Sequence, residues 1–93
     1  MSGEVDDRVT LVIVPKVDKA LRKLARKDRS TFERLRKKIE DIRRNPEVGS
    51  PKRYHLKGYR GVHVGPHVIL YTWDEQEGVV SIMEIAHHDH AYN

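Results

Sequence analysis

The six histidines of this 93-residue chain are the side chains best suited to chemistry near neutral pH, and all of them lie in its second half. Histidine gains and loses its proton in the physiological range. His63 is the best placed of the six. In the run Arg60–Val64 it alternates with two valines, so His63 and its neighbour Gly61 should point away from the face that the valines occupy. The pattern predicts a titratable ring on one face of a sheet, with a glycine beside it.

Other polar groups near His63 could donate to phosphate or move protons. They are Lys57 and Arg60, which precede it, and His55 and His67 on either side of it. Lys57 and Arg60 are better candidates for phosphate contacts than more distant cations, because they flank the expected site. Each could also be an ordinary surface charge.

The run His87-His88-Asp89-His90 suggests a metal site at first sight. Adjacent strand residues point to opposite faces, however, and cannot easily share one ion. The chain also has no cysteine, which excludes a disulfide framework and a thiolate metal cluster. We therefore expect no metal site and no cofactor.

The cations are concentrated in one segment. The chain has a net charge of +4, and Lys16–Arg44 contains 13 Lys/Arg against five Asp/Glu. Such a segment can be a solvated helical face, or it can be the electrostatic footprint of a nucleic-acid partner.

The first half of the chain predicts one strand and two helices. Residues 1–8 are typical of a flexible terminus, and the apolar run Val9–Val14 predicts a strand buried on both faces, inside the sheet. Helical spacing of apolar residues follows Pro15 and continues to Asn45-Pro46, with a break before Ser30-Thr31-Phe32-Glu33. The four residues Ser30 to Glu33 have the form of a capping box at the start of the second helix. Two antiparallel helices are expected.

The second half predicts strands. Arg53–Leu56 is a possible short strand, Arg60–Val64 and His67–Trp73 form a hairpin through Gly65-Pro66, and Val79–Ala86 is the last strand. Within it, Glu84 is either a polar residue on an open face or the partner of a histidine. Three aromatic residues are more typical of packing than of recognition: Phe32, Tyr71 and Trp73.

This order, β-α-α-β-β-β, predicts an α+β fold in which the helical hairpin packs on one face of a mainly antiparallel four-stranded sheet. The other face has no sequence left to cover it, and we expect the site there. Residues 1–93 would form a single domain. No apolar run approaches the ~20 residues that cross a bilayer, so we expect a cytoplasmic protein with no membrane partner.

Three short motifs resemble the RelE/ParE superfamily of toxins from type II toxin–antitoxin systems. They are Leu56-Lys57-Gly58 before the hairpin, Val-Ile-Leu-Tyr at 68–71, and Ile-Ala-His-His-Asp-x-Ala-Tyr at 85–92, an ending also similar to RelE-like domains fused to some helicases. The order of elements is RelE-like as well. The resemblance implies an endoribonuclease that cuts mRNA on the ribosome and is silenced by a cognate antitoxin.

The chemistry that the resemblance implies needs no metal. A substrate 2′-hydroxyl attacks the adjacent phosphorus, which asks for a base, an acid and fixed positive charge on the phosphoryl oxygens. Within the superfamily the chain is similar to a His-rich type, exemplified by YafQ. By position in the motifs, His55, His63 and His88 match histidines of that type, while His67 stands where it has an aspartate.

The resemblance assigns the acid–base work to His63 and His88, with His55 and His67 nearby. Lys57 and Arg60 would hold phosphate, and Tyr92 would stack on a base or anchor the C-terminus as an apolar plug. The basic segment Lys16–Arg44 would face ribosomal RNA or the antitoxin.

Two alternatives remain open. A ParE-like inhibitor of DNA gyrase would act without catalysis, although a protein that only binds has no need of several histidines on one face. A catalytically inactive RelE-like module would bind a partner only. The chain lacks an Arg that many members carry after the hairpin turn or near the C-terminus, which favours the inactive module over the gyrase inhibitor.

Overall fold

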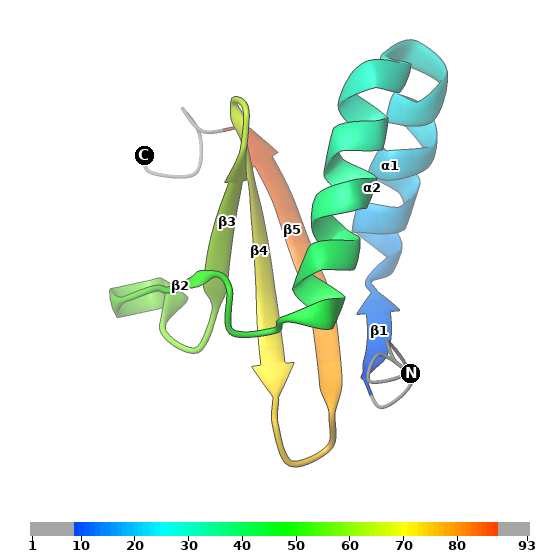
Figure 1. Cartoon of the computed structure of the whole chain (residues 1–93). Coiled ribbons are helices and arrows are strands. Elements are labelled where there is room, and N and C mark those ends of the chain that lie inside the picture. The colour runs from blue at the N-terminus through cyan, green and yellow to red at the C-terminus, as the bar shows by residue number, and fades with distance from the viewer. Residues whose placement is uncertain (1–8, 88–93) are drawn as a thin grey trace.

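The computed structural model describes residues 9–87. In chain order its elements are β1 (Thr10–Ile13), α1 (Pro15–Lys27), α2 (Arg29–Arg44), β2 (Ser50–Pro51), the 3-10 turn η2 (Tyr54–Leu56), β3 (Arg60–Val64), β4 (His67–Asp74) and β5 (Val79–His87). Figure 1 shows α1 and α2 side by side against one face of the sheet. Within residues 9–87 no α-helix covers the opposite face, which we call the open face, and only the short turn η2 and the segment after it border it. The predicted α+β class is confirmed.

Both helices begin at residues suited to a helix start. Pro15 opens α1, where its missing N–H has no intrahelical partner to lose. Asp28 separates the helices and caps α2, because its carboxylate accepts hydrogen bonds from the Thr31 backbone (3.2 Å) and hydroxyl (2.7 Å). The expected capping box is therefore wrong: Asp28 caps the helix in place of Ser30, and Glu33 pairs with arginines of α2.

The sheet has five strands in the order β1-β5-β4-β3-β2, and only the β1–β5 pair is parallel. The four-strand count missed β2, a two-residue strand that pairs with β3. Arg53–Leu56 is not a strand, since η2 occupies it. The first strand also lies at the sheet edge and not inside it. Its apolar run is covered by helices on one face only, which leaves Val12 41% exposed.

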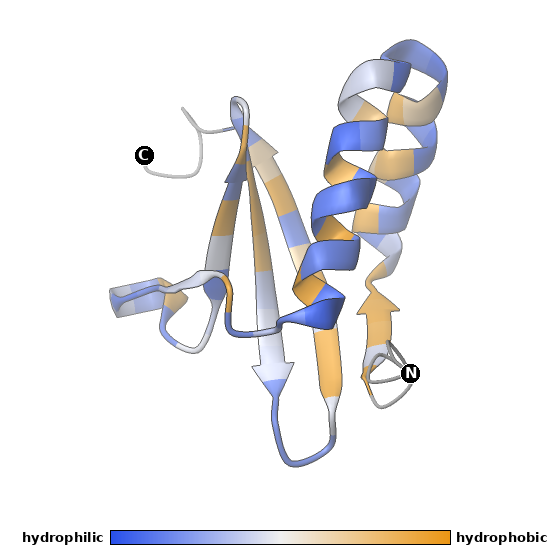
Figure 2. Ribbon diagram, in the orientation of Figure 1, coloured by the Kyte–Doolittle hydropathy of each residue, from blue (hydrophilic) through white to orange (hydrophobic). Residues whose placement is uncertain are grey.

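The core lies between the helices and the inner face of the sheet. Figure 2 shows apolar residues in both layers, on the helices and along the strands, interspersed with hydrophilic ones. Tyr71 is fully buried there, and Phe32 and Trp73 pack at the margin, so their predicted packing roles are confirmed. The remaining core side chains are Val17, Leu21, Leu35, Ile39, Ile42, Val64, Ile69, Val80 and Ile82.

The hairpin between β3 and β4 is confirmed, with Val64 paired to His67 across the two-residue turn. Gly65 has a φ of +57°, which the first position of such a turn requires and which Pro66 could not adopt. Neither helix in the described part of the chain is long and apolar enough to cross a membrane.

Candidate functional site

The residues of β3 alternate between the two faces of the sheet. Val62 and Val64 pack against the helical core, whereas His63 is exposed on the open face. Its cross-strand partner is Val68 of β4. The next pair on the same face of these strands is Gly61 with Leu70. The predicted placement of His63 is confirmed.

A pocket of about 710 Å³ lies on the open face, next to the row that contains His63. Leu70 and Glu84, which are cross-strand partners on β4 and β5, line it. Ala86 also lines it and is paired to Val68, the residue opposite His63. The rest of the lining includes Lys16 from the start of α1, Met83 from β5, and His55, Leu56 and Tyr59 from η2 and the segment after it.

Lys16 and Glu84 form an ion pair across this pocket, with Nζ 2.5 Å from Oε1. The hydrogen bond to Glu84, and then its negative charge, raise the pKa of Lys16 above the ordinary value. The structure thus decides between the two interpretations of Glu84: it is a polar residue of the open face, paired with a lysine. Sequence reasoning missed Lys16 because nothing local connects the start of α1 with β5.

Lys52 is a second group that sequence reasoning missed. Its side chain crosses the open face directly over Gly61, where a Cβ atom would collide with the Lys52 Cε. The absence of a side chain at Gly61 thus makes room for a cation on the same face of β3 as His63, two residues before it. The only sequence signal was a glycine beside the histidine.

His55 and Lys57 lie on the segment that borders the open face, but in and after the turn η2 and not on the short strand suggested for Arg53–Leu56. His55 belongs to η2 and lines the pocket, while Lys57 directly follows η2 and is exposed. The Lys57 backbone N–H donates to the Tyr54 carbonyl (3.0 Å), which closes this turn.

Arg60 and His67 lie on the other side of the sheet, so the expected cluster around His63 is divided between two faces. Arg60 donates to the backbone carbonyls of Glu47 (3.2 Å) and Gly49 (2.8 Å), in the loop after α2. An odd number of strand positions separates Arg60 from His63, which forces them apart.

His67 is paired with the core residue Val64 and therefore shares the face of the helices. Its ring meets that of His87 edge-on, with centroids 5.8 Å apart. Its Nδ1 atom is buried and has no hydrogen-bond partner among the described residues. His88 and Tyr92 lie outside the described residues.

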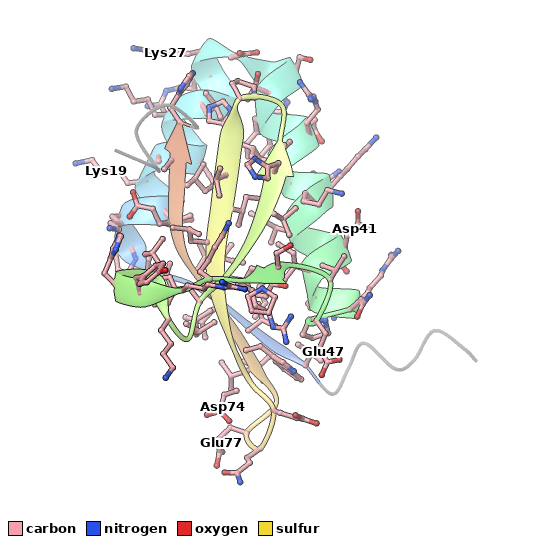
Figure 3. The ribbon with its side chains drawn as sticks, turned by 90° about the vertical axis from the view of Figure 1, so that its left-hand side faces the viewer. Lys19, Lys27, Asp41, Glu47, Asp74 and Glu77 are labelled. Carbon is pink, nitrogen blue, oxygen red and sulfur yellow. The ribbon has the colours of Figure 1, made fainter. Side chains whose placement is uncertain are left out.

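A stripe of cations on α1 begins at the pocket. Lys16 is followed three residues later by Lys19, four later by Lys23 and then by the adjacent pair Arg26 and Lys27, and this set is the α1 stripe. After Lys16, none of these side chains is ion-paired within residues 9–87. Figure 3, which looks onto the open face, shows Lys19 and Lys27 projecting outward beyond β5. On α2, by contrast, Glu33, Glu40 and Asp41 pair with five cations: Arg29, Arg36, Lys38, Arg43 and Arg44.

Residues 11–92 match the family model described as the ParE toxin of the type II toxin–antitoxin system parDE. The chain belongs to this ParE toxin family. It is therefore a toxin of the RelE/ParE superfamily, as the resemblance of its motifs predicted.

Individual relatives of this ParE-family toxin support the same family assignment and the same fold. It is 33% identical over 81 residues to a candidate toxin named RelE4 from Methanocaldococcus jannaschii, with 86% of each chain covered. Among solved structures it is similar to the RelBE2 toxin–antitoxin complex of Mycobacterium tuberculosis (TM-score 0.73, 25% identity, 85% of this chain and 96% of that chain). The YoeB/ParE toxin of Agrobacterium tumefaciens has the same fold (TM-score 0.73, 18% identity, 86% and 99%).

The open face of this ParE-family toxin combines two kinds of group. His63 and His55 provide imidazole rings, a side chain suited to proton transfer, and Lys52 provides positive charge, whereas the charge of Lys16 is balanced by Glu84. Cleavage of a phosphodiester bond requires this combination: groups that transfer protons, beside positive charge that stabilises the phosphoryl oxygens.

Proposed function

We propose that this toxin is an endoribonuclease that cleaves mRNA on the ribosome, in the cytoplasm. The observation that supports the proposal is the exposed His63 ring on the open face of the sheet, near a pocket and a lysine. Domains of this size have little room for an enclosed chamber, so a long RNA substrate suits an open face.

The proposed reaction uses the substrate's own 2′-hydroxyl. A base removes its proton, the 2′-oxygen forms a bond to phosphorus, and the bond to the 5′-oxygen breaks. An acid gives that oxygen a proton. The products are a 2′,3′-cyclic phosphate and a 5′-hydroxyl end, and the residues of the protein supply every proton transfer.

In this proposal His63 and His88 share the acid–base work, and His55 at the pocket rim is a third proton-transfer candidate. Lys57 retains its proposed phosphate contact, and Tyr92 its stacking role. Lys52 takes the phosphate role first given to Arg60, because Arg60 is engaged with backbone carbonyls on the far side of the sheet. His67 has no direct role, since it faces the helices.

The proposed partners are a cognate antitoxin and the ribosome. The solved M. tuberculosis relative is a toxin–antitoxin complex, which supports the first. The α1 stripe supports the second, because its cations after Lys16 have no carboxylate partner within residues 9–87 and are available to ribosomal RNA phosphates. An antitoxin that covers the open face would also silence the toxin.

Primer extension on a reporter mRNA tests the activity. The purified toxin should produce discrete cuts with 5′-hydroxyl ends when programmed ribosomes are present and none when they are absent. Uncut mRNA under both conditions would overturn the nuclease proposal.

Inhibition of DNA gyrase is the second candidate function, supported by the match to the ParE family model. It predicts intact mRNA together with raised DNA-damage signalling when the toxin is expressed. Neither effect would favour the third candidate, an inactive module that binds a partner only.

A further inference from the structure

Tyr54 is the most exposed large hydrophobic side chain in the described part of the chain. It is 87% exposed, against 48% for Val48 and 41% for Val12. A ring this exposed contributes almost nothing to the core, and the hydrophobic effect alone would favour a polar residue there.

The backbone at Tyr54 adds a second observation. Its φ is +58°, a value that no other non-glycine residue among residues 9–87 adopts. This conformation is costly for a bulky side chain and persists only where the surrounding structure imposes it. Hydrogen bonds on both sides do so here, from Leu56 N–H to the Arg53 carbonyl (3.1 Å) and from Lys57 N–H to the Tyr54 carbonyl (3.0 Å). The turn thus holds the ring out into solvent.

The segment around the ring is basic. Residues 48–61 contain Lys52, Arg53, Lys57 and Arg60 but no aspartate or glutamate. Arg60 points to the helical side, which leaves three cations within three residues of Tyr54 in the sequence: Lys52, Arg53 and Lys57. The segment also adjoins the pocket, since His55 and Leu56, the next two residues, line it.

We propose that Tyr54 stacks on an unpaired base of a single-stranded RNA that crosses the open face, with Lys52, Arg53 and Lys57 along its phosphates. An exposed ring amid cations suits this ligand, because every base has a π-face and phosphates follow each base at regular spacing. The inference rests on the proposed function in that it takes RNA to be the ligand of the open face. It adds a stacking residue outside the histidine set, next in the chain to His55, which lines the pocket.

A binding measurement tests this without any cleavage. A fluorescein-labelled ten-nucleotide RNA is titrated with the wild type and with Tyr54→Ala, Tyr54→Phe and Val48→Ala, the last being a control that trims another exposed apolar side chain of the same region. Tyr54→Ala should bind about 5- to 100-fold more weakly. Tyr54→Phe and Val48→Ala should bind like the wild type. The slope of affinity against salt should be the same for all four, because no charge is removed.

A double-mutant cycle with RNA identifies the contact. If Tyr54 stacks on a base, replacing that nucleotide by an abasic one should weaken wild-type binding but leave Tyr54→Ala almost unaffected. Equal losses at every abasic position in both proteins would overturn the inference, as would a Tyr54→Ala protein with full affinity and an unchanged melting temperature. Ribosome-dependent cleavage is scored separately. Wild-type binding without cleavage would remove the nuclease proposal and leave the stacking result standing, whereas ribosome-dependent cleavage without any binding of the free RNA would overturn the stacking inference and leave the nuclease proposal standing.

Discussion

The phenol oxygen of Tyr71 lies 2.8 Å from the backbone nitrogen of Gly49 and accepts its hydrogen bond. The same hydroxyl donates to the carbonyl of Pro46 (2.7 Å). Burial raises the pKa of Tyr71, so the hydroxyl stays protonated and able to donate at physiological pH. One core side chain on β4 therefore fixes the loop that leads from α2 to β2 and on to Lys52.

Tyr71→Phe should destabilise the toxin by about 1–3 kcal/mol, because it leaves a buried N–H and a carbonyl without their partner. Urea denaturation measures the loss. Gly49→Ala should cost a similar amount by another route, since an added Cβ would lie 2.7 Å from the Tyr71 hydroxyl. The combined variant should lose less than the sum of the two, because both changes break one contact. Full additivity would contradict this account of the loop.

His63→Asn should reduce ribosome-dependent cleavage by about 10²- to 10⁴-fold, the usual contribution of a positioned acid or base. Primer extension measures it, and an unchanged melting temperature shows that the fold is intact. His67→Asn is the matched control, because His67 lies on the adjacent strand but faces the helices. Equal loss of cleavage in the two variants would place the active site elsewhere.

Glu84→Gln should strengthen RNA binding. Glu84 is the only acidic residue that lines the pocket within residues 9–87, and it neutralises Lys16. Removing its charge should steepen the dependence of affinity on salt by up to about 1 in log–log slope, as one more cation meets a phosphate. Cleavage should persist. A loss of cleavage with binding retained would instead make Glu84 a proton-transfer group.

Replacing Lys19, Lys23 and Lys27 by glutamine should weaken binding to ribosomes and lower the log–log salt slope by about 2 to 3. The control replaces three cations that are already ion-paired: Arg22, Arg29 and Arg36. This second variant should change the slope less, although it removes the same charge. Equal changes would show that total charge, and not the α1 stripe, governs binding.

Asp28 predicts a pH dependence of stability. Hydrogen bonds from the Thr31 hydroxyl and then from its backbone N–H lower the pKa of Asp28. Because the folded pKa is the lower one, the carboxylate stabilises the fold above its unfolded pKa of about 3.9, and this is lost as the pH falls through the folded value. Asp28→Asn should therefore melt below the wild type at pH 6, and the difference should shrink towards pH 2. A constant difference across that range would contradict the charge-based explanation.

Much of the fold could be predicted from periodicity. The spacing of apolar residues placed both helices and three strands, and Gly65-Pro66 placed the hairpin turn. These signals are local. The position of β1 is not, because an apolar run does not show which strand will pair with it. Nor did the chain reveal β2, since two residues are too few for a pattern.

The part of the site that could be predicted is the face of the sheet on which each strand residue lies, because side chains alternate along a strand. Alternation around His63 placed it correctly on the open face, and the same rule applied to Arg60 would have placed that residue on the other side. Lys16 and Glu84 meet through tertiary folding, from segments far apart in sequence, and Lys52 reaches the position of Gly61 across the sheet. Only the isolated Glu84 in an apolar strand and the glycine beside His63 hinted at them.

The parallel pairing of β1 with β5 also bears on when the toxin becomes active during its own synthesis. The first strand to leave the ribosome can join the sheet only after the last strand has been made. The pocket also forms late, because Lys16 belongs to an early segment of the chain and its partner Glu84 to a late one. A nascent chain therefore has no assembled site until β5 has left the ribosome. An antitoxin that binds nascent chains would meet the two halves before they close on one another.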